Sequence, residues 1–180
     1  MNKISHDLYR GVINKDLVVN YTYRFDDDGK YKTVSKTNSG KIVIRPSYFI
    51  IISEGFDKPS LFIRSMRYHH FAQLLSSSIK NISENLYDIF PDIGRMEFEI
   101  DSLTLQRYQT EKAMSTGEFT SIPCVYADDT GTCYPGIRIS GLKSSIVIPL
   151  EDAISISHLF NTFEPNIFGL SILKMLGNFN

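Results

Sequence analysis

An apolar strand that leads directly into an amphipathic helix occurs twice in this chain, and this recurrence constrains the fold more than any other feature. The first copy is SLFI at 60–63, followed by apolar positions at helical spacing from Phe71 onward. The second is SIVI at 145–148, with the same spacing from Ile156 onward, so that strand and helix share an offset of 85 positions. Self-similarity of this kind indicates two copies of one unit. We therefore predict an α+β fold of two ββββα repeats, with two antiparallel four-stranded sheets related by a pseudo-twofold axis, each followed by a helix that covers its inner face.

Length and composition favour one domain. The 180 residues, 42% of them hydrophobic, can bury one substantial core and leave little room for a second. We expect residues 1–15 to form an N-terminal arm or a short helix. Residues 16–180 should form a single domain that contains the repeats 16–90 and 95–176.

Charge is distributed unevenly along the chain. Residues 1–90 carry 13 basic and 9 acidic side chains, a net charge of +4, whereas residues 91–180 carry 6 basic and 11 acidic ones, a net charge of −5. An anionic partner should therefore prefer the first half.

The lack of targeting signals and the small number of cysteines favour a cytoplasmic protein. The sequence contains no signal peptide and no apolar run long enough to span a bilayer, so we expect no membrane association. The two cysteines, Cys124 and Cys133, fall on adjacent predicted strands and could face each other. In a chain without targeting signals we expect them to remain reduced and to pack in the interior.

Period-two alternation and turn signals predict the elements of the first half. Between residues 16 and 25 the odd positions are apolar, as is typical of a half-buried antiparallel strand. The sequence DDDG at 26–29 should form a tight hairpin turn rather than a calcium loop, because the ligand spacing of an EF-hand is missing. Pro46 implies a bulge or an edge position within a long strand. The predicted elements are strands at 16–25, 31–36, 41–53 and 60–65 and a helix at 67–90.

The second half shows the same order of elements. Glu151 and Asp152 suit the positive end of a helix dipole, so a helix should begin there, and Pro165 should end it. The apolar segment 168–176 should then pack on the core or on a partner subunit. Residues 110–117 are polar and are expected to be mobile. The predicted strands are 95–108, 118–127, 133–140 and 145–150.

The sequence shows no recognisable catalytic or cofactor-binding pattern. His69 and His70 are neighbours on a predicted helix and point about a hundred degrees apart, so they are poor co-ligands for a metal and better read as solvated residues. No glycine-rich phosphate loop, nucleophile elbow or zinc spacing occurs. We therefore expect a binding protein without a cofactor, a metal or a small-molecule substrate, and not an enzyme.

A basic face interleaved with aromatic residues is the strongest functional signal in the first half. Cations on an open sheet can track phosphates, and aromatic rings there can stack on unpaired bases. Alternatively, the aromatic residues belong to the core and the lysines only aid solubility. The candidate contacts are the cations Arg24, Lys32, Lys36, Lys41, Arg45 and Arg64, the outward Phe62, and three tyrosines near this surface or just behind it, Tyr21, Tyr23 and Tyr48.

The order of elements resembles that of the Whirly family of single-stranded DNA-binding proteins, and one repeat resembles the DNA-binding domain of positive cofactor four. The strand and helix at 60–80 look most like these families, and the resemblance covers about residues 16–176. It implies binding to single-stranded DNA or RNA in replication, recombination or transcription, and assembly into a homo-oligomer. A tailed-phage protein of this kind would act in the host cytoplasm.

Two functional classes remain open on the sequence alone. The basic first half and the duplicated pattern favour a single-stranded nucleic-acid-binding protein. The overall net charge of −1 favours the alternative, a non-enzymatic interaction or structural protein such as a virion or regulatory subunit.

Overall fold

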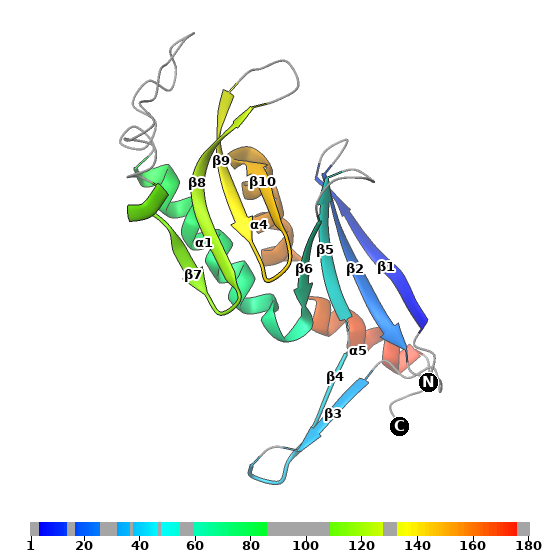
Figure 1. Ribbon diagram of the computed structural model, residues 1–180. Coiled ribbons are helices and arrows are strands. Elements are labelled where there is room, and N and C mark those ends of the chain that lie inside the picture. Colours follow the sequence, from blue (N-terminus) through cyan, green and yellow to red (C-terminus); the bar gives the residue numbers. More distant parts are fainter. Residues whose placement is uncertain are drawn as a thin grey trace.

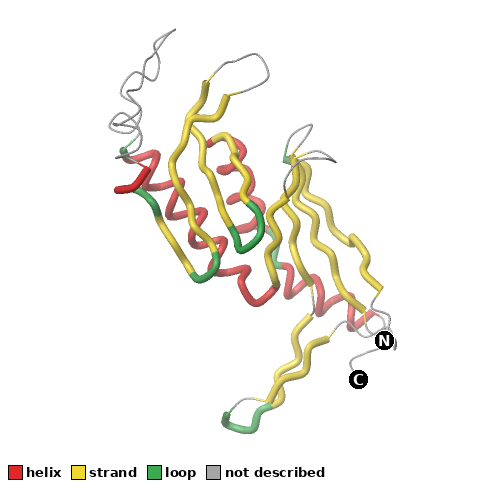
Figure 2. Tube along the Cα trace, in the orientation of Figure 1, coloured by secondary structure: helices red, strands yellow, loops and turns green. Residues whose placement is uncertain are grey.

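Two antiparallel sheets and their helices make up the computed structural model (Figures 1 and 2). The described strands form two four-stranded sheets and a separate two-stranded ribbon. This confirms the α+β class and the two antiparallel sheets. The structure describes residues 4–13, 17–25, 32–36, 38–46, 48–54, 60–85, 109–127 and 133–175.

The first sheet has the order β1-β2-β5-β6. Its strands are β1 (Ile4–Val12), β2 (Leu17–Phe25), β5 (Tyr48–Glu54) and β6 (Ser60–Arg64). Alternation along β2 works as predicted, because its odd positions from Leu17 to Tyr23 are buried on the inner face. The same rule buries Ile50 and Ile52 on β5 and Leu61 and Ile63 on β6.

Strand β1 corrects the prediction of an arm or short helix at residues 1–15. It pairs with β2 along nearly its whole length, from Ile4 opposite Phe25 to Val12 opposite Val18. The register shifts between Asp7 and Tyr9. An irregularity of this kind interrupts the period-two pattern, which explains why the sequence did not read as a strand.

The ribbon of β3 (Lys32–Lys36) and β4 (Ile42–Pro46) corrects the predicted first sheet. These strands pair with each other and not with β2, and β1 takes the fourth place in the sheet. The predicted strand 41–53 is two strands, since β4 ends at Pro46 and β5 begins at Tyr48. Proline lacks the N–H that a continuous ladder requires, as the sequence indicated. The predicted turn at 26–29 lies outside the described residues.

The second sheet has the order β10-β9-β8-β7. Its strands are β7 (Met114–Thr116), β8 (Phe119–Ala127), β9 (Cys133–Ser140) and β10 (Ser145–Pro149). The last three were predicted. Strand β7 falls within the segment that was expected to be mobile, and Gly117, with φ +56°, makes the turn from β7 to β8. The predicted strand 95–108 lies outside the described residues.

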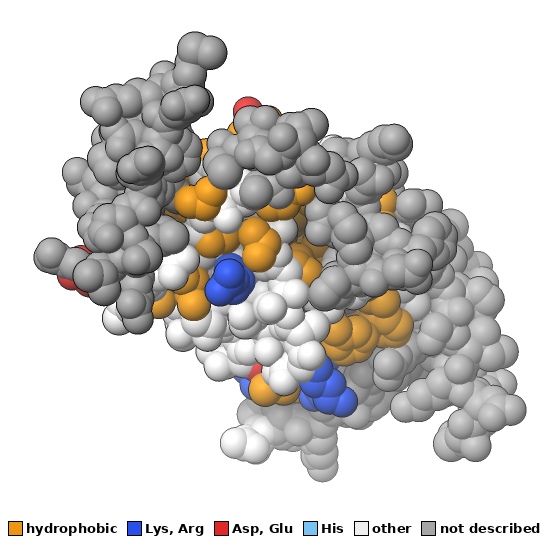
Figure 3. Space-filling model, turned by 45° about the horizontal axis from the view of Figure 1, so that its top comes forward, with side chains coloured by type: hydrophobic (Ala, Val, Ile, Leu, Met, Phe, Trp, Pro, Cys, Tyr) orange, Lys and Arg blue, Asp and Glu red, His pale blue; other side chains and the backbone are white. Residues whose placement is uncertain are grey.

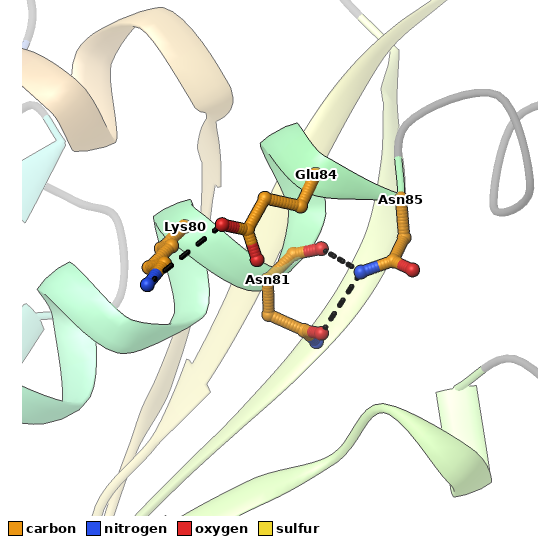
Figure 4. A network of polar contacts seen from close by, with 4 residues as sticks. All are labelled: Lys80, Asn81, Glu84 and Asn85. Atoms are coloured by element: carbon orange, nitrogen blue, oxygen red, sulfur yellow. Dashed lines mark hydrogen bonds and ion pairs between the residues drawn. The ribbon is translucent and has the colours of Figure 1, made fainter.

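Helices begin directly after the last strand of each sheet. A short 3-10 turn, η1 (Ser65–Arg67), leads from β6 into α1 (Tyr68–Glu84), and α4 (Leu150–Thr162) follows β10 without a gap. The helix α5 (Pro165–Met175) starts at Pro165, where a missing N–H carries no penalty. The C-terminal end of α1 is held by the ion pair Lys80–Glu84 and by Asn85 bonded to Asn81 (Figure 4).

The helices do not each cover the sheet that they follow, which corrects that part of the prediction. Helix α1 packs on β7 and β8 of the second sheet, where the Phe71 and Phe119 rings lie 5.2 Å apart. Helix α4 packs on β9 and β10 of that same sheet and on α1. The inner face of the first sheet is instead contacted by the end of α4 and by α5, through the ring pairs Tyr21–Phe163 at 4.6 Å and Tyr23–Phe168 at 5.7 Å.

One continuous core joins the two sheets. The edge strands β6 and β10 lie beside each other, and the Ser144 hydroxyl donates a hydrogen bond of 2.5 Å to the Ser60 carbonyl. At Gly141 a Cβ atom would come within 3.3 Å of Leu61, so glycine permits this close approach. The two sheets therefore meet edge to edge along β6 and β10.

Candidate nucleic-acid interface

The outer side of β5 and β6 carries two stacked phenylalanines and an arginine. Cross-strand pairing sets Phe49 opposite Arg64 and Ile51 opposite Phe62. The Phe49 and Phe62 rings lie 4.9 Å apart with 31° between their planes. Phe62 is 41% exposed, and Arg64 is also exposed. We call Phe49, Ile51, Phe62 and Arg64 the β5–β6 face.

Strand alternation explains why these residues are outside. Along β6 the inward Leu61 and Ile63 are fully buried, so the intervening Phe62 and the terminal Arg64 must point to the opposite side. Exposed phenylalanine is costly in water unless it has a partner, because its apolar surface stays hydrated. Hydrophobic side chains lie in the open on the surface shown in Figure 3, with lysine and arginine side chains next to them.

The three predicted stacking tyrosines are in the core, and that part of the candidate site is wrong. Tyr21 and Tyr23 have no exposed surface, and Tyr48 is 3% exposed. They occupy inward positions of β2 and β5, beneath the end of α4 and the start of α5. Alternation told the two faces of the strands apart but could not tell which face the helices cover, so the alternative reading of these residues as core is the correct one.

Hydrogen bonds and pKa shifts show what the buried tyrosines do. The Tyr23 hydroxyl donates to the Pro165 carbonyl at 2.8 Å, and the Tyr68 hydroxyl donates to the carbonyls of Phe160 at 2.9 Å and Phe163 at 3.1 Å. The latter two carbonyls belong to the end of α4, where no intrahelical donor remains. Burial raises the pKa of Tyr68 to about 12, so it stays a neutral donor.

Tyr48 differs from Tyr23 and Tyr68, whose hydroxyls donate to carbonyls. Burial, reinforced by the nearby Tyr23, Tyr68 and Glu164, raises the pKa of Tyr48 far above its ordinary value. Its hydroxyl is buried without a hydrogen-bond partner among the residues that the structure describes. An unsatisfied hydroxyl of this kind destabilises the folded state.

The remaining predicted cations are not gathered on the β5–β6 face. Arg24 lies in β2 opposite Ser5, and Lys32, Lys36 and Arg45 lie in the ribbon. In the ribbon Arg45 pairs with Thr33, and by alternation Lys32 and Lys36 occupy register positions of the opposite face. The exposed Lys41 sits at the ribbon tip, about 17 Å from Pro46 at 3.3 Å per residue. The structure divides Lys41, Arg45 and Arg64 between the ribbon and β6, and their sharing one binding surface stays a prediction.

Phe49 and Ile51 were missed by the sequence reasoning. Their signal was present, because they alternate with Tyr48, Ile50 and Ile52, but that run is apolar at every position and period two is invisible in it. Also missed was the outer face of the second sheet. There the exposed Arg138 lies between Ile122 and Val147 in one cross-strand row.

The cysteines do not face each other. Cys124 pairs with Gly136, whereas Cys133 pairs with Ala127, three ladder positions away. Cys124 is free and buried, as expected of a reduced packing residue. Burial raises the pKa of its thiol to about 11, although the neighbouring Arg138 opposes the shift.

Other kinds of site gain no support from the described part of the chain. His69 and His70 are exposed on α1, as predicted for solvated residues. Within the described ranges no three His, Cys, Asp or Glu side chains are close enough together to hold a metal ion. Likewise, none of the described helices is both long and apolar enough to cross a membrane. Comparisons with family models, with curated proteins and with solved structures give no match.

Proposed function

We propose that this chain binds single-stranded nucleic acid, DNA in the first instance, through the β5–β6 face. The observation that carries the proposal is the exposed Phe62 ring, which is stacked on Phe49 and lies two residues from Arg64 on the same face of β6. Rings on an open sheet stack with bases at about 1–3 kcal/mol each, and a guanidinium binds phosphate through paired N–H donors. The three side chains together fit one nucleotide step.

The geometry favours a single strand over a duplex. Bases in a duplex are stacked on each other and present only their edges in the grooves, whereas an unpaired base exposes its whole face to a ring. Asn20, Ser53 and Ser60 are partly exposed and occupy the same outer side as the phenylalanines, by alternation and register. Polar groups of this size can bond to bases or sugars without excluding any one base.

The resemblance to the Whirly family supports the same function. It also implies a duplicated arrangement and a homo-oligomer. We infer a role in replication, recombination or transcription, in the cytoplasm. The order of strands and helices along the chain supports this inference. The packing of α1 and α4 on the same sheet departs from a strict duplication.

A binding titration of labelled single-stranded DNA, single-stranded RNA and duplex DNA at several salt concentrations tests the proposal. Phe62→Ala should weaken single-strand binding by about 5-fold to 150-fold, the equivalent of one stacked base, with little change in salt dependence. Arg64→Gln should instead lower the salt slope by about 0.7, the share of one phosphate contact.

Lys80→Gln is the matched control, because it removes one exposed cation near the C-terminal end of α1, and that end lies away from β5 and β6 (Figure 1). It should leave affinity and slope close to those of the unchanged protein. If the Phe62 and Arg64 variants bind with the same affinity as the unchanged protein, the β5–β6 face is not the binding site.

An interaction protein remains the second candidate because of one observation. Ile167 is 64% exposed and Leu170 is 38% exposed on α5, and exposed aliphatic side chains of this size often mark a contact surface. Absence of binding to every nucleic acid in the titration would make this second function the better one.

A further inference from the structure

A cavity of about 440 Å³ opens where β8, β9 and the start of α4 meet. Its volume lies in the range of sites that take a small group or a few side chains. Tyr126 and Tyr134 are cross-strand partners at the last described pairs of β8 and β9, and they form one wall. Pro149 and Ile154 contribute to another, and Glu151 and Asp152 bring carboxylates from the first turn of α4.

The chemistry of the lining selects a cationic side chain with an apolar stem. Among the described residues that line the cavity there is no lysine, arginine or histidine. Tyrosine faces attract an ammonium group, and apolar walls accept its methylene chain. The dipole of α4 opposes a cation here with about half a positive charge, but the two carboxylates exceed it about fourfold.

A cation of the right placement stands at the tip of the β3–β4 ribbon. Residues 38–41 are exposed, and Gly40, with φ +79°, allows the tight turn that presents Lys41. The ribbon extends away from both sheets, at the opposite end of the molecule from the ends of β8 and β9 (Figure 1). The tip therefore cannot reach the cavity of its own chain, and only a second copy can bring the two together.

We propose that the ribbon tip of one copy inserts Lys41 into this cavity of another copy. The ammonium group lies against Glu151 and Asp152, and the side-chain stem lies between the Tyr134 ring and Ile154. The tip belongs to the basic first half of the chain and the cavity to the acidic second half, so the net charges of the two halves also favour this contact. Because tip and cavity are different surfaces, the contact is heterologous and copies join head to tail.

Sedimentation velocity without nucleic acid tests this contact independently of the proposed function. The unchanged protein should associate in a concentration-dependent manner, more weakly at high salt. The cavity variant Glu151→Gln/Asp152→Asn and the tip variant Lys41→Gln should each weaken association by about tenfold or more. Lys80→Gln and Glu84→Gln are controls that remove exposed charges elsewhere, and they should associate like the unchanged protein.

Mixing the two variants gives the sharpest outcome. The cavity variant keeps an intact tip and the tip variant keeps an intact cavity, so an equimolar mixture should form dimers and nothing larger. Tyr134→Ala, at a 43% exposed side chain, should also weaken association while leaving the start of α4 in place, which guards against misfolding of the acidic variant. An unchanged protein that stays monomeric, variants that associate normally, or a mixture without dimers would each overturn the proposal.

Discussion

At the scale of single residues, tyrosine hydroxyls connect the C-terminal helices to the first sheet. Tyr23 reaches Pro165 from β2, and Tyr68 reaches the end of α4 from the start of α1. The Tyr68 bonds are made to carbonyls at the C-terminal end of α4, where a donor from elsewhere in the fold is needed, whereas the Tyr23 bond is made to the first carbonyl of α5. Tyr48 lies in the same cluster, with its ring 5.3 Å from that of Tyr23, but without a comparable bond among the described residues.

Replacing each of two tyrosines by phenylalanine should have opposite effects on stability. Tyr23→Phe removes the buried hydrogen bond to the Pro165 carbonyl and should lower the free energy of unfolding by about 1 kcal/mol. Tyr48→Phe removes a buried hydroxyl that has no partner among the described residues, and should leave that free energy unchanged or raise it. Urea denaturation of both variants measures the difference. A loss in Tyr48→Phe as large as that in Tyr23→Phe would contradict the assignment.

Alkaline pH should destabilise the protein through the same cluster. The pKa of Tyr68 is raised from 10.0 to about 12 in the folded state, so between these values the folded protein binds more protons than the unfolded chain. The free energy of unfolding therefore falls as pH rises above 10, while below pH 10 this group contributes no pH dependence. Cys124 acts in the same direction from its ordinary value of 9.0 to about 11.

Urea denaturation below and above pH 10 in a Cys124→Ala background isolates the tyrosine effect. Adding Tyr68→Phe to that background should reduce the slope of stability against pH. If the slope is the same with and without Tyr68, the tyrosine does not carry the effect.

The residues of the candidate face show what could be predicted at this scale. Phe62 and Arg64 were placed outward correctly, because β6 alternates cleanly with Leu61 and Ile63. The tyrosines on β2 alternate just as cleanly, yet they face inward. Alternation fixes which residues share a face, but the cover over that face comes from α4 and α5, more than a hundred residues away in the sequence.

At the scale of elements, local signals predicted those that obey a regular period and missed those that do not. The strands β2, β6, β8, β9 and β10 and the helices α1 and α4 follow from period and from the position of proline, whereas α5 was expected only as a separate apolar segment. Strand β1 was missed because its register shift breaks the period. Strand β7 was missed because only three residues carry it.

Pairing between elements was less predictable than their existence. The sequence placed β3 beside β2, since a turn signal lies between them, but β3 pairs with β4 and the ribbon stands apart. Strand β2 gains β1 and β5 as neighbours, and β5 brings the buried Ile50 and Ile52 to its inner face. Burial of that face outweighs the local preference for a hairpin between β2 and β3.

At the scale of the whole molecule, the segment after Pro165 has two sides. Phe168 packs on Tyr23 and Phe163, at ring distances of 5.7 Å and 5.4 Å, so one side of α5 belongs to the core. Ile167 and Leu170 are exposed on the other side. The sequence left open whether this segment packs on the core or on a partner. The contacts of Phe168 show that one side of the segment packs on the core.

Substitutions on the two sides of α5 should therefore separate folding from surface effects. Phe168→Ala removes a ring from the cover of the first sheet and should lower the free energy of unfolding by about 2 kcal/mol or more, with Tyr23 becoming accessible to solvent. Ile167→Ser alters an exposed side chain and should change that free energy by less than about 0.5 kcal/mol. Urea denaturation followed by tyrosine fluorescence measures both. Comparable losses in the two variants would mean that the exposed side of α5 is also buried, and mass measurement of Ile167→Ser by light scattering would then show whether a partner copy covers it.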